Sequence, residues 1–180
     1  MRSLIKSVAA VAVVLIGTGA CATPNTNAGA VSDGSGSQAA SPQPPAPETP
    51  TWGKRYTWPD KLAVEVAAPR PCKPSEYAQP PDIKRAVLLT VTVINGTDKP
   101  FDVGVLSVAA EAQFAGRKAE SVIDFGGPCA GSGGMGSGTV LPGKTFAYDL
   151  AFAVNAEPGE LQLAMQPQFD SAKAIFVGQA

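Results

Sequence analysis

Histidine is missing from all 180 residues of the chain. This side chain is the usual base at neutral pH, a common metal ligand and the partner of most catalytic serines and cysteines. The acidic residues are scattered, without the spacing of a paired-carboxylate site or of a calcium-binding loop. We therefore expect no catalytic residue, no metal and no cofactor, and hence a protein that is not an enzyme.

Charge is also scarce in this sequence. Charged residues make up 16% of the chain, and the net charge is -1. Proteins that bind nucleic acid carry a basic patch or stripe that neutralises phosphates. The composition therefore argues against nucleic acid as a partner.

A long helical stripe is absent as well, whereas glycine and proline are plentiful. The chain has 19 glycines and 17 prolines. Together they exceed the share of about 12% that is usual for the pair. Both residues favour turns, loops and extended linkers. This composition favours an all-β fold over a helical one.

The first 20 residues have the parts of a secretory signal peptide. Arg2 and Lys6 give a basic start, residues 8–16 are apolar, and small residues precede Cys21. A transmembrane helix needs about 20 apolar residues, so this run is too short to span a bilayer. We predict a lipoprotein signal peptide over residues 1–20.

The segment before Cys21, Thr18-Gly19-Ala20, resembles the lipobox of bacterial lipoproteins, although Thr18 departs from the usual leucine. The resemblance implies that the Cys21 thiol carries diacylglycerol, with acyl chains such as palmitate. The protein would then be held on the extracytoplasmic face of the cell membrane. Ordinary signal-peptidase cleavage after Ala22 is the alternative, and it would release a soluble secreted protein.

The two remaining cysteines, Cys72 and Cys129, form an even pair once Cys21 carries the lipid. Disulfides form and persist in oxidising compartments outside the cytoplasm. A bridge closing a loop of about 57 residues would stabilise the fold by about 4 kcal/mol in the chain-entropy model. We expect this bridge, and two free thiols are the alternative.

Residues 21–51 are rich in proline, serine, glycine and alanine and contain no aromatic residue. Such a segment cannot bury a hydrophobic core. We expect it to be a disordered linker that joins the lipidated cysteine to a single domain over residues 52–180.

Alternation of apolar and polar side chains dominates the domain and indicates β-strands. The pattern is strongest over residues 84–95 and 146–154, and we also expect a strand over residues 106–115 followed by a hairpin at Gly116. Asn95-Gly96 ends the first of these strands, which we attribute to its tolerance of left-handed backbone. Seven to nine short strands separated by turns predict an antiparallel β-sandwich.

Four features also resemble a known family. They are the tryptophan-containing first strand YTWPDKLAVEV, a central VxVxN strand closed by Asn95, the Gly116 hairpin, and Leu141-Pro142-Gly143-Lys144 before an aromatic strand. They resemble a domain of unknown function in lipoproteins of actinobacteria and other Gram-positive bacteria, which is similar to the mycobacterial secreted immunoprotective antigen. The resemblance covers about residues 52–177 and implies an immunoglobulin-like fold. It implies no activity.

Three aromatic residues at the start of the domain, Trp52, Tyr56 and Trp58, allow two interpretations. They could form a platform on which the sugar rings of an envelope glycan stack. They could equally pack the first strand against the sandwich, which is the more common role of large aromatic side chains. We favour packing.

These observations leave three functional hypotheses in descending order. The first is a non-catalytic, lipid-anchored module of the cell envelope that binds a protein or acts as an accessory. The second is a module that binds an envelope glycan or a small ligand, and the third is an enzyme. Immunoglobulin-like sandwiches often present edges and loops to partners, which favours the first hypothesis by analogy.

Overall fold

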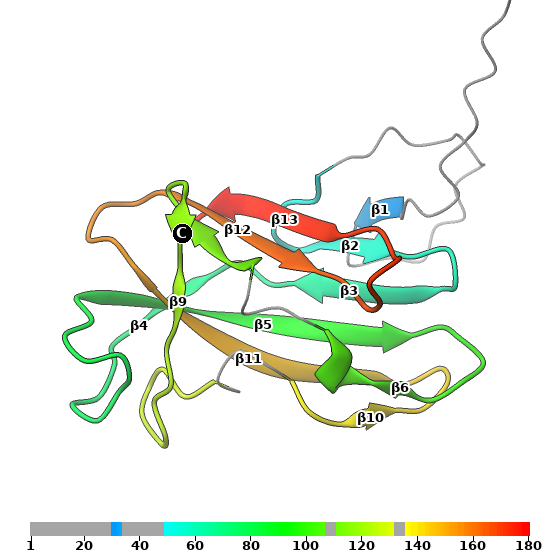
Figure 1. Ribbon diagram of the computed structural model, residues 1–180, viewed down its shortest axis with the longest axis horizontal. Coiled ribbons are helices and arrows are strands. Elements are labelled where there is room, and N and C mark those ends of the chain that lie inside the picture. The colour runs from blue at the N-terminus through cyan, green and yellow to red at the C-terminus, as the bar shows by residue number, and fades with distance from the viewer. Residues whose placement is uncertain (1–29, 34–48, 107–110, 132–135) are drawn as a thin grey trace, which may run out of the picture.

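The computed structural model describes residues 30–33, 49–106, 111–131 and 136–180 (Figure 1). The predicted signal peptide, Cys21 and most of the predicted linker lie outside the described residues. Within these ranges, no helix is long and apolar enough to cross a membrane. Apart from loops and turns, the described residues form antiparallel strands and include a 3-10 turn, η1 (Val103–Val105).

One layer of the sandwich is a seven-stranded sheet in the order β1-β2-β3-β5-β11-β9, and β4 pairs with a separate part of β5. β3 pairs with residues 91–95 of β5, and β4 pairs with residues 86–88. β5 and β11 therefore form the centre of this layer. Its strands are β1 (Ala30–Asp33), β2 (Lys54–Thr57), β3 (Leu62–Val66), β4 (Arg70–Cys72), β5 (Arg85–Asn95), β9 (Glu120–Ser121) and β11 (Thr145–Val154).

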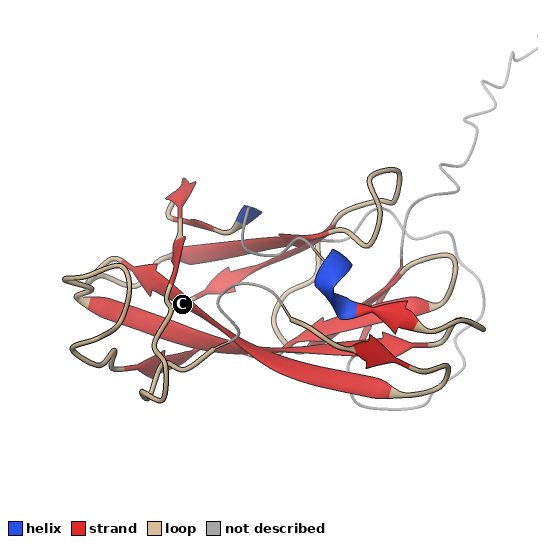
Figure 2. Cartoon of the chain, turned by 60° about the horizontal axis from the view of Figure 1, so that its bottom comes forward, coloured by secondary structure: helices blue, strands red, loops and turns tan. Residues whose placement is uncertain are grey.

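The opposite layer is a four-stranded sheet in the order β13-β12-β7-β8. A separate two-stranded sheet pairs β6 (Phe101–Asp102) with β10 (Thr139–Val140). Figures 1 and 2 show the two main layers packed face to face. The strands of the second layer are β7 (Gln113–Phe114), β8 (Arg117–Lys118), β12 (Glu160–Met165) and β13 (Ala174–Gln179).

The main hydrophobic core lies between the two layers and is built from alternate residues of the strands. Leu89 and Val91 of β5 are fully buried there, whereas Thr90 and Thr92 face outward and are partly exposed. This alternation is the one that residues 84–95 predict. From the facing strands, the core receives Tyr148, Leu150, Phe152 and Val154 of β11, Leu161, Leu163 and Met165 of β12, and Ala174 and Phe176 of β13.

A smaller hydrophobic cluster covers the outer face of β5 at one end. Ala86 and Leu88 point away from the main core and are nevertheless buried. The disulfide between Cys72 and Cys129, whose Cα atoms lie 5.3 Å apart, closes this cluster. We call this end of the sandwich the disulfide end. The other buried members of the cluster are Ala78, Val122 and Ala151.

The expected strand over residues 106–115 is wrong in its described part. The Asp102 carboxylate accepts a 2.9 Å hydrogen bond from the backbone nitrogen of Gly104, which caps η1 and ends β6. Glu111 and Ala112 belong to no strand, and only β7 continues the predicted pattern. Residues 107–110 lie outside the described part of the chain.

The expectation of a disordered linker over residues 21–51 is wrong at two places. β1 pairs with β2, and Val31 packs against the main core. The carbonyl oxygen of Pro50 accepts a 2.9 Å hydrogen bond from Val177 of β13. Val31 is the one large aliphatic residue between residues 22 and 50. Its side chain can bury apolar surface against the core, which explains why this short segment packs on the domain.

The turn after β5 depends on the side chain of Asn95 and not on left-handed backbone. Its amide nitrogen donates 2.7 Å hydrogen bonds to the carbonyl oxygens of Lys99 and Val140. Neither Asn95 nor Gly96 has a positive φ. Glycine is required at position 96 because a Cβ there would lie 2.5 Å from the carbonyl oxygen of Lys61. The proposed reason for this turn was therefore wrong, although its position was right.

The architecture is an all-β, immunoglobulin-like antiparallel sandwich, as the strand pattern and the family resemblance predict. The described residues contain thirteen strands instead of seven to nine. Five of them have only two residues, which is too short to leave an alternating pattern in the sequence.

Candidate functional site

The three aromatic residues considered as a glycan platform do not form one. Tyr56 is 6% exposed and Trp58 is 3% exposed, and their rings meet edge to face with centroids 5.1 Å apart. Both belong to the main core. Stacking on a sugar requires an accessible ring face, which neither side chain offers.

Trp52 lies too far from Trp58 to share a surface with it. The Trp52 indole nitrogen donates a 2.9 Å hydrogen bond to the carbonyl of Gln179, at the last residue of β13. The Trp58 indole nitrogen donates to Ala172, just before the first residue of β13. A strand rises about 3.3 Å per residue, so the two indoles are separated by roughly the length of this strand.

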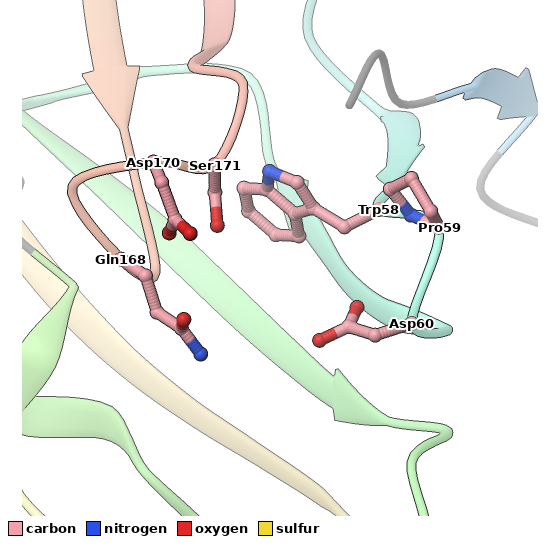
Figure 3. A pocket seen from close by; sticks show the side chains of 6 residues that line it. All are labelled: Trp58, Pro59, Asp60, Gln168, Asp170 and Ser171. Carbon is pink, nitrogen blue, oxygen red and sulfur yellow. The ribbon is translucent and has the colours of Figure 1, made fainter. Parts of the chain in front are cut away.

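A polar hollow of about 270 Å³ lies beside Trp58 at the opposite end of the sandwich from the disulfide. We call this end the loop end, because the β2–β3 turn meets the loop between β12 and β13 there. Figure 3 shows the Asp60 and Asp170 carboxylates and the Ser171 hydroxyl around the space next to the indole. The remaining lining residues are Pro59 and Gln168. This hollow can offer hydrogen bonds and negative charge to a small polar ligand.

A second hollow, of about 380 Å³, adjoins the first and shares Gln168 with it. Its walls include Val105, Pro167 and Phe169. Phe169 is fully exposed and Val105 is about half exposed. The backbone around Phe169 is held by the Gln166 side-chain amide, which donates to the carbonyls of Phe169 and Ser171. The loop end therefore presents one polar and one apolar hollow side by side.

Two loops at the disulfide end expose three large apolar side chains. Tyr77 is 80% exposed, Phe125 is 94% exposed and Ile123 is 37% exposed. Gln79 and Ile123 form an antiparallel bridge, and Tyr77 and Phe125 each lie two residues from it. The bridge therefore brings the two aromatic residues to the same end. We call Tyr77, Ile123 and Phe125 the disulfide-end surface.

A buried carboxylate fixes the loops that carry this surface. Asp124, which is 2% exposed, accepts hydrogen bonds from the backbone nitrogen and the hydroxyl of Ser75 and from the backbone nitrogen of Cys129. The Ser75 hydroxyl is the main cause that lowers the pKa of Asp124, with the two backbone donors adding to it. Asp124 thus ties both loops to the disulfide and has a structural role in this end of the domain.

Metal ligands do not gather in the described ranges, where no group of three His, Cys, Asp or Glu side chains comes together. Asp60 and Asp170 face the same hollow, but a metal site in a protein usually needs further ligands. These two carboxylates alone therefore do not make up a metal site.

Sequence reasoning missed Tyr77, Phe125 and Phe169 as surface residues. Each lies in a segment that connects two strands, and each is flanked by polar or turn-forming residues, as in QPQFDSAK. A lone aromatic residue inside a polar turn is the signal that could have identified them. Such a residue lies outside the strands, and the core is built from the inward faces of the strands. Cys21, the predicted lipidation site, lies outside the described residues.

No family model matches this chain, and no curated protein matches it. Among solved structures, it is similar to ycdA of Bacillus subtilis, a provisionally assigned lipoprotein, with a TM-score of 0.51 and 16% sequence identity. That alignment covers 67% of this chain and 36% of the other, so the chain spans about a third of the length of that protein.

Two further structures align less well. An uncharacterized β-sandwich protein from Clostridium difficile gives a TM-score of 0.37 at 15% identity, covering 66% of this chain and 85% of the other. A FixG-related protein from Vibrio parahaemolyticus gives 0.34 at 9% identity, covering 66% and 93%. The similarity to the Bacillus subtilis protein shows a shared fold for the sandwich and nothing about its activity.

Proposed function

We propose that this protein is a lipid-anchored lipoprotein of the cell envelope, whose sandwich domain binds a protein partner without catalysing a reaction. The lipid is attached at Cys21, and the domain stands on the extracytoplasmic side of the membrane. The partner contacts the disulfide-end surface of Tyr77, Ile123 and Phe125.

The cysteines support the proposed location. Cys72 and Cys129 pair with each other inside the domain, which leaves Cys21 as the remaining thiol of the chain. A structural disulfide is typical of an oxidising compartment, and Cys21 directly follows the small residues of the lipobox-like segment. The provisional assignment of the Bacillus subtilis protein with a similar fold as a lipoprotein points in the same direction.

The exposure of Tyr77 and Phe125 is the observation that carries the binding proposal. Large exposed apolar patches on a protein surface mark interaction sites, and aromatic residues are enriched in protein interfaces. Here the disulfide, the Asp124 hydrogen bonds and the bridge between Gln79 and Ile123 hold the loops in place. A surface that is ordered before binding loses less entropy on association.

Site-specific photo-cross-linking in intact cells tests this proposal. A photoreactive phenylalanine analogue replaces Tyr77, and the same analogue replaces Leu141 as a matched control, since Leu141 is 57% exposed and lies outside the disulfide-end surface. We expect one discrete adduct from position 77 and none of that mass from position 141. Phe125→Ala should reduce the yield of this adduct at least fivefold.

An equal set of adducts from both positions, or no adduct from position 77, would contradict the binding proposal. The anchor is tested separately with Cys21→Ser, which should move the protein from the membrane fraction to the medium or to a soluble envelope fraction. Retention of this variant in the membrane would contradict lipidation at Cys21.

The polar hollow at the loop end favours a second candidate function, the binding of an envelope glycan or another small polar ligand. Carboxylate, amide and hydroxyl groups from Asp60, Gln168, Asp170 and Ser171 line this hollow, as in sites that hydrogen-bond sugars. Asp60→Ala with Asp170→Ala should abolish the retention of the domain on purified peptidoglycan if this function operates. Retention that is unchanged in the double variant would exclude the hollow as the glycan site.

A further inference from the structure

β1 occupies the outer edge of the larger sheet although it does not belong to a hairpin. It pairs with β2 in the register that sets Ala30 opposite Thr57 and Asp33 opposite Lys54. Residues 34–53 separate the two strands, whereas hairpin loops usually have 2 to 5 residues. The pairing therefore depends on the contacts of β1 with the edge of β2, and these include the packing of Val31 against the core.

The position of β1 in the chain limits the distance between the domain and the lipid. Cys21 lies nine residues before Ala30. An extended chain covers at most about 3.4 Å per residue, so a docked β1 keeps the sandwich within about 30 Å of the anchor. If β1 leaves the sheet, the tether runs to Thr49 and its 28 residues reach up to about 95 Å.

The pairing also determines which end of the sandwich receives the tether. Ala30 lies opposite Thr57, the residue directly before Trp58, so the docked chain enters at the loop end. Figure 1 shows β1 beside β2 at the outer edge of the sheet, with the disulfide-end loops on the far side of the molecule. Without β1, the tether joins the domain at Pro50. The carbonyl oxygen of Pro50 accepts a hydrogen bond from Val177, which lies toward the other end of β13.

We propose that the free edge of β2 is a docking surface for residues 30–33 of the same chain, and that this docking sets the length and direction of the lipid tether. In the docked state the loop end faces the membrane at short range and the disulfide-end surface points away from it. This inference rests on the proposed lipid at Cys21, and it assigns β1 a positioning role for the proposed binding surface.

The docked state is reversible because β1 contributes little to the fold. It is four residues long, Val31 is partly buried against the core, and Ala30 and Ser32 are exposed. Ordering four residues costs conformational entropy that one partly buried side chain offsets only in part. Removal of β1 leaves β2 paired with β3, so the rest of the sheet keeps its hydrogen bonds.

Two variants trap the two states, and a third is the control. Val31→Pro removes a backbone donor and the packed side chain, and so releases β1. Ala30→Cys with Thr57→Cys places a disulfide across the observed register and locks β1 in place. Ser37→Pro is the matched control, because it adds a proline to the connection between β1 and β2 and leaves β1 itself unchanged.

Amide hydrogen exchange on the full-length, non-lipidated Cys21→Ser chain tests the docking without the anchor. We expect the β2 amides that point toward β1 to exchange at least tenfold faster in Val31→Pro than in the parent chain or in Ser37→Pro, whereas the β2 amides that point toward β3 should not change. Exchange that is equally fast in the parent chain and in Val31→Pro would overturn the docking. This measurement stands whether or not Cys21 carries a lipid.

Neutron reflectometry of the lipidated chain on a planar bilayer then tests the tether. The parent and the locked variant should hold the protein layer within about 30 Å of the headgroups, and Val31→Pro should move it outward by tens of ångströms. Equal layer positions for the locked variant and Val31→Pro would overturn the inference. A chain that carries no lipid contradicts the proposed function instead, and leaves the exchange result as the test of docking.

Discussion

The indole nitrogen of Trp58 donates a 2.7 Å hydrogen bond to the carbonyl oxygen of Ala172, 114 residues further along the chain. This bond joins the β2–β3 turn of one layer to the loop between β12 and β13 of the other layer. Trp58 is therefore both a core side chain and a link between the two sheets at the loop end.

Trp58→Ala should destabilise the domain far more than Trp52→Ala. The first change empties a fully packed site and leaves the Ala172 carbonyl unpaired, which we expect to cost about 3–5 kcal/mol. Trp52 is only partly buried, so Trp52→Ala should lower the free energy of unfolding by only about 1–2 kcal/mol. Urea unfolding of the two variants measures the difference. Equal losses for the two variants would contradict the assignment of Trp58 to the core.

Asp124→Asn should lower the stability of the domain at neutral pH, and this loss should shrink in acid. Hydrogen bonds hold the folded-state pKa of Asp124 below its ordinary value of 3.8. The carboxylate therefore stabilises the fold above that value, and its contribution disappears as the pH falls through the lower folded-state pKa. Melting temperatures of the two proteins between pH 7 and pH 2 should converge at the acid end.

Asp82→Asn is the control for this prediction, because Asp82 is exposed on the neighbouring loop. It should change the melting temperature little over the same pH range. A difference between the Asp124→Asn variant and its parent that stays constant down to pH 2 would be evidence against the ionised carboxylate as the source of the effect.

Removal of the disulfide by Cys72→Ala with Cys129→Ala should cost about 4 kcal/mol, because the bridge closes a long loop of the unfolded chain. It should also weaken the small cluster around Leu88 and expose the loops that carry Tyr77 and Phe125. Urea unfolding gives the first quantity, and hydrogen exchange in residues 74–83 gives the second. A variant as stable as its parent would show that the bridge has no stabilising role.

Tyr148→Phe should leave the stability unchanged or raise it by about 1 kcal/mol. The Tyr148 hydroxyl is buried and has no hydrogen-bond partner among the described residues, and burial raises the pKa of this group. A buried hydroxyl without a partner costs desolvation energy, which phenylalanine avoids. Calorimetric melting of the two proteins decides the sign, and a loss greater than about 1 kcal/mol would reveal a partner for this hydroxyl.

The long strands at the centre of the sandwich could be predicted because their side chains follow one simple rule. β5 and β11 pair from Thr145 opposite Ile94 to Val154 opposite Arg85, and both show the alternation that a half-buried strand requires. The disulfide partners were also predicted, since parity left a single pairing once Cys21 was set aside. These features depend on local pattern or on counting.

The failures occur where distant residues decide the local structure. The apolar residues between positions 106 and 115 alternate as in a strand. However, the Asp102-capped turn η1 lies directly before this region, and only Gln113 and Phe114 of it pair with β12. β1 forms because the β2 edge is available to Val31, which no local pattern reveals. The bridge between Gln79 and Ile123 brings Tyr77 and Phe125 to the same end of the sandwich, and the sequence does not encode this contact locally.

The proposed function requires that one chain carries both a lipid at Cys21 and an intact disulfide in its sandwich. Intact and peptide mass spectrometry of the protein from native membranes, without reduction, tests both parts. We predict a mature N-terminus at Cys21 with a diacylglycerol adduct, and a linked peptide that contains Cys72 and Cys129. A chain that begins at Thr23 without lipid, or two separate cysteine peptides with free thiols, would contradict it.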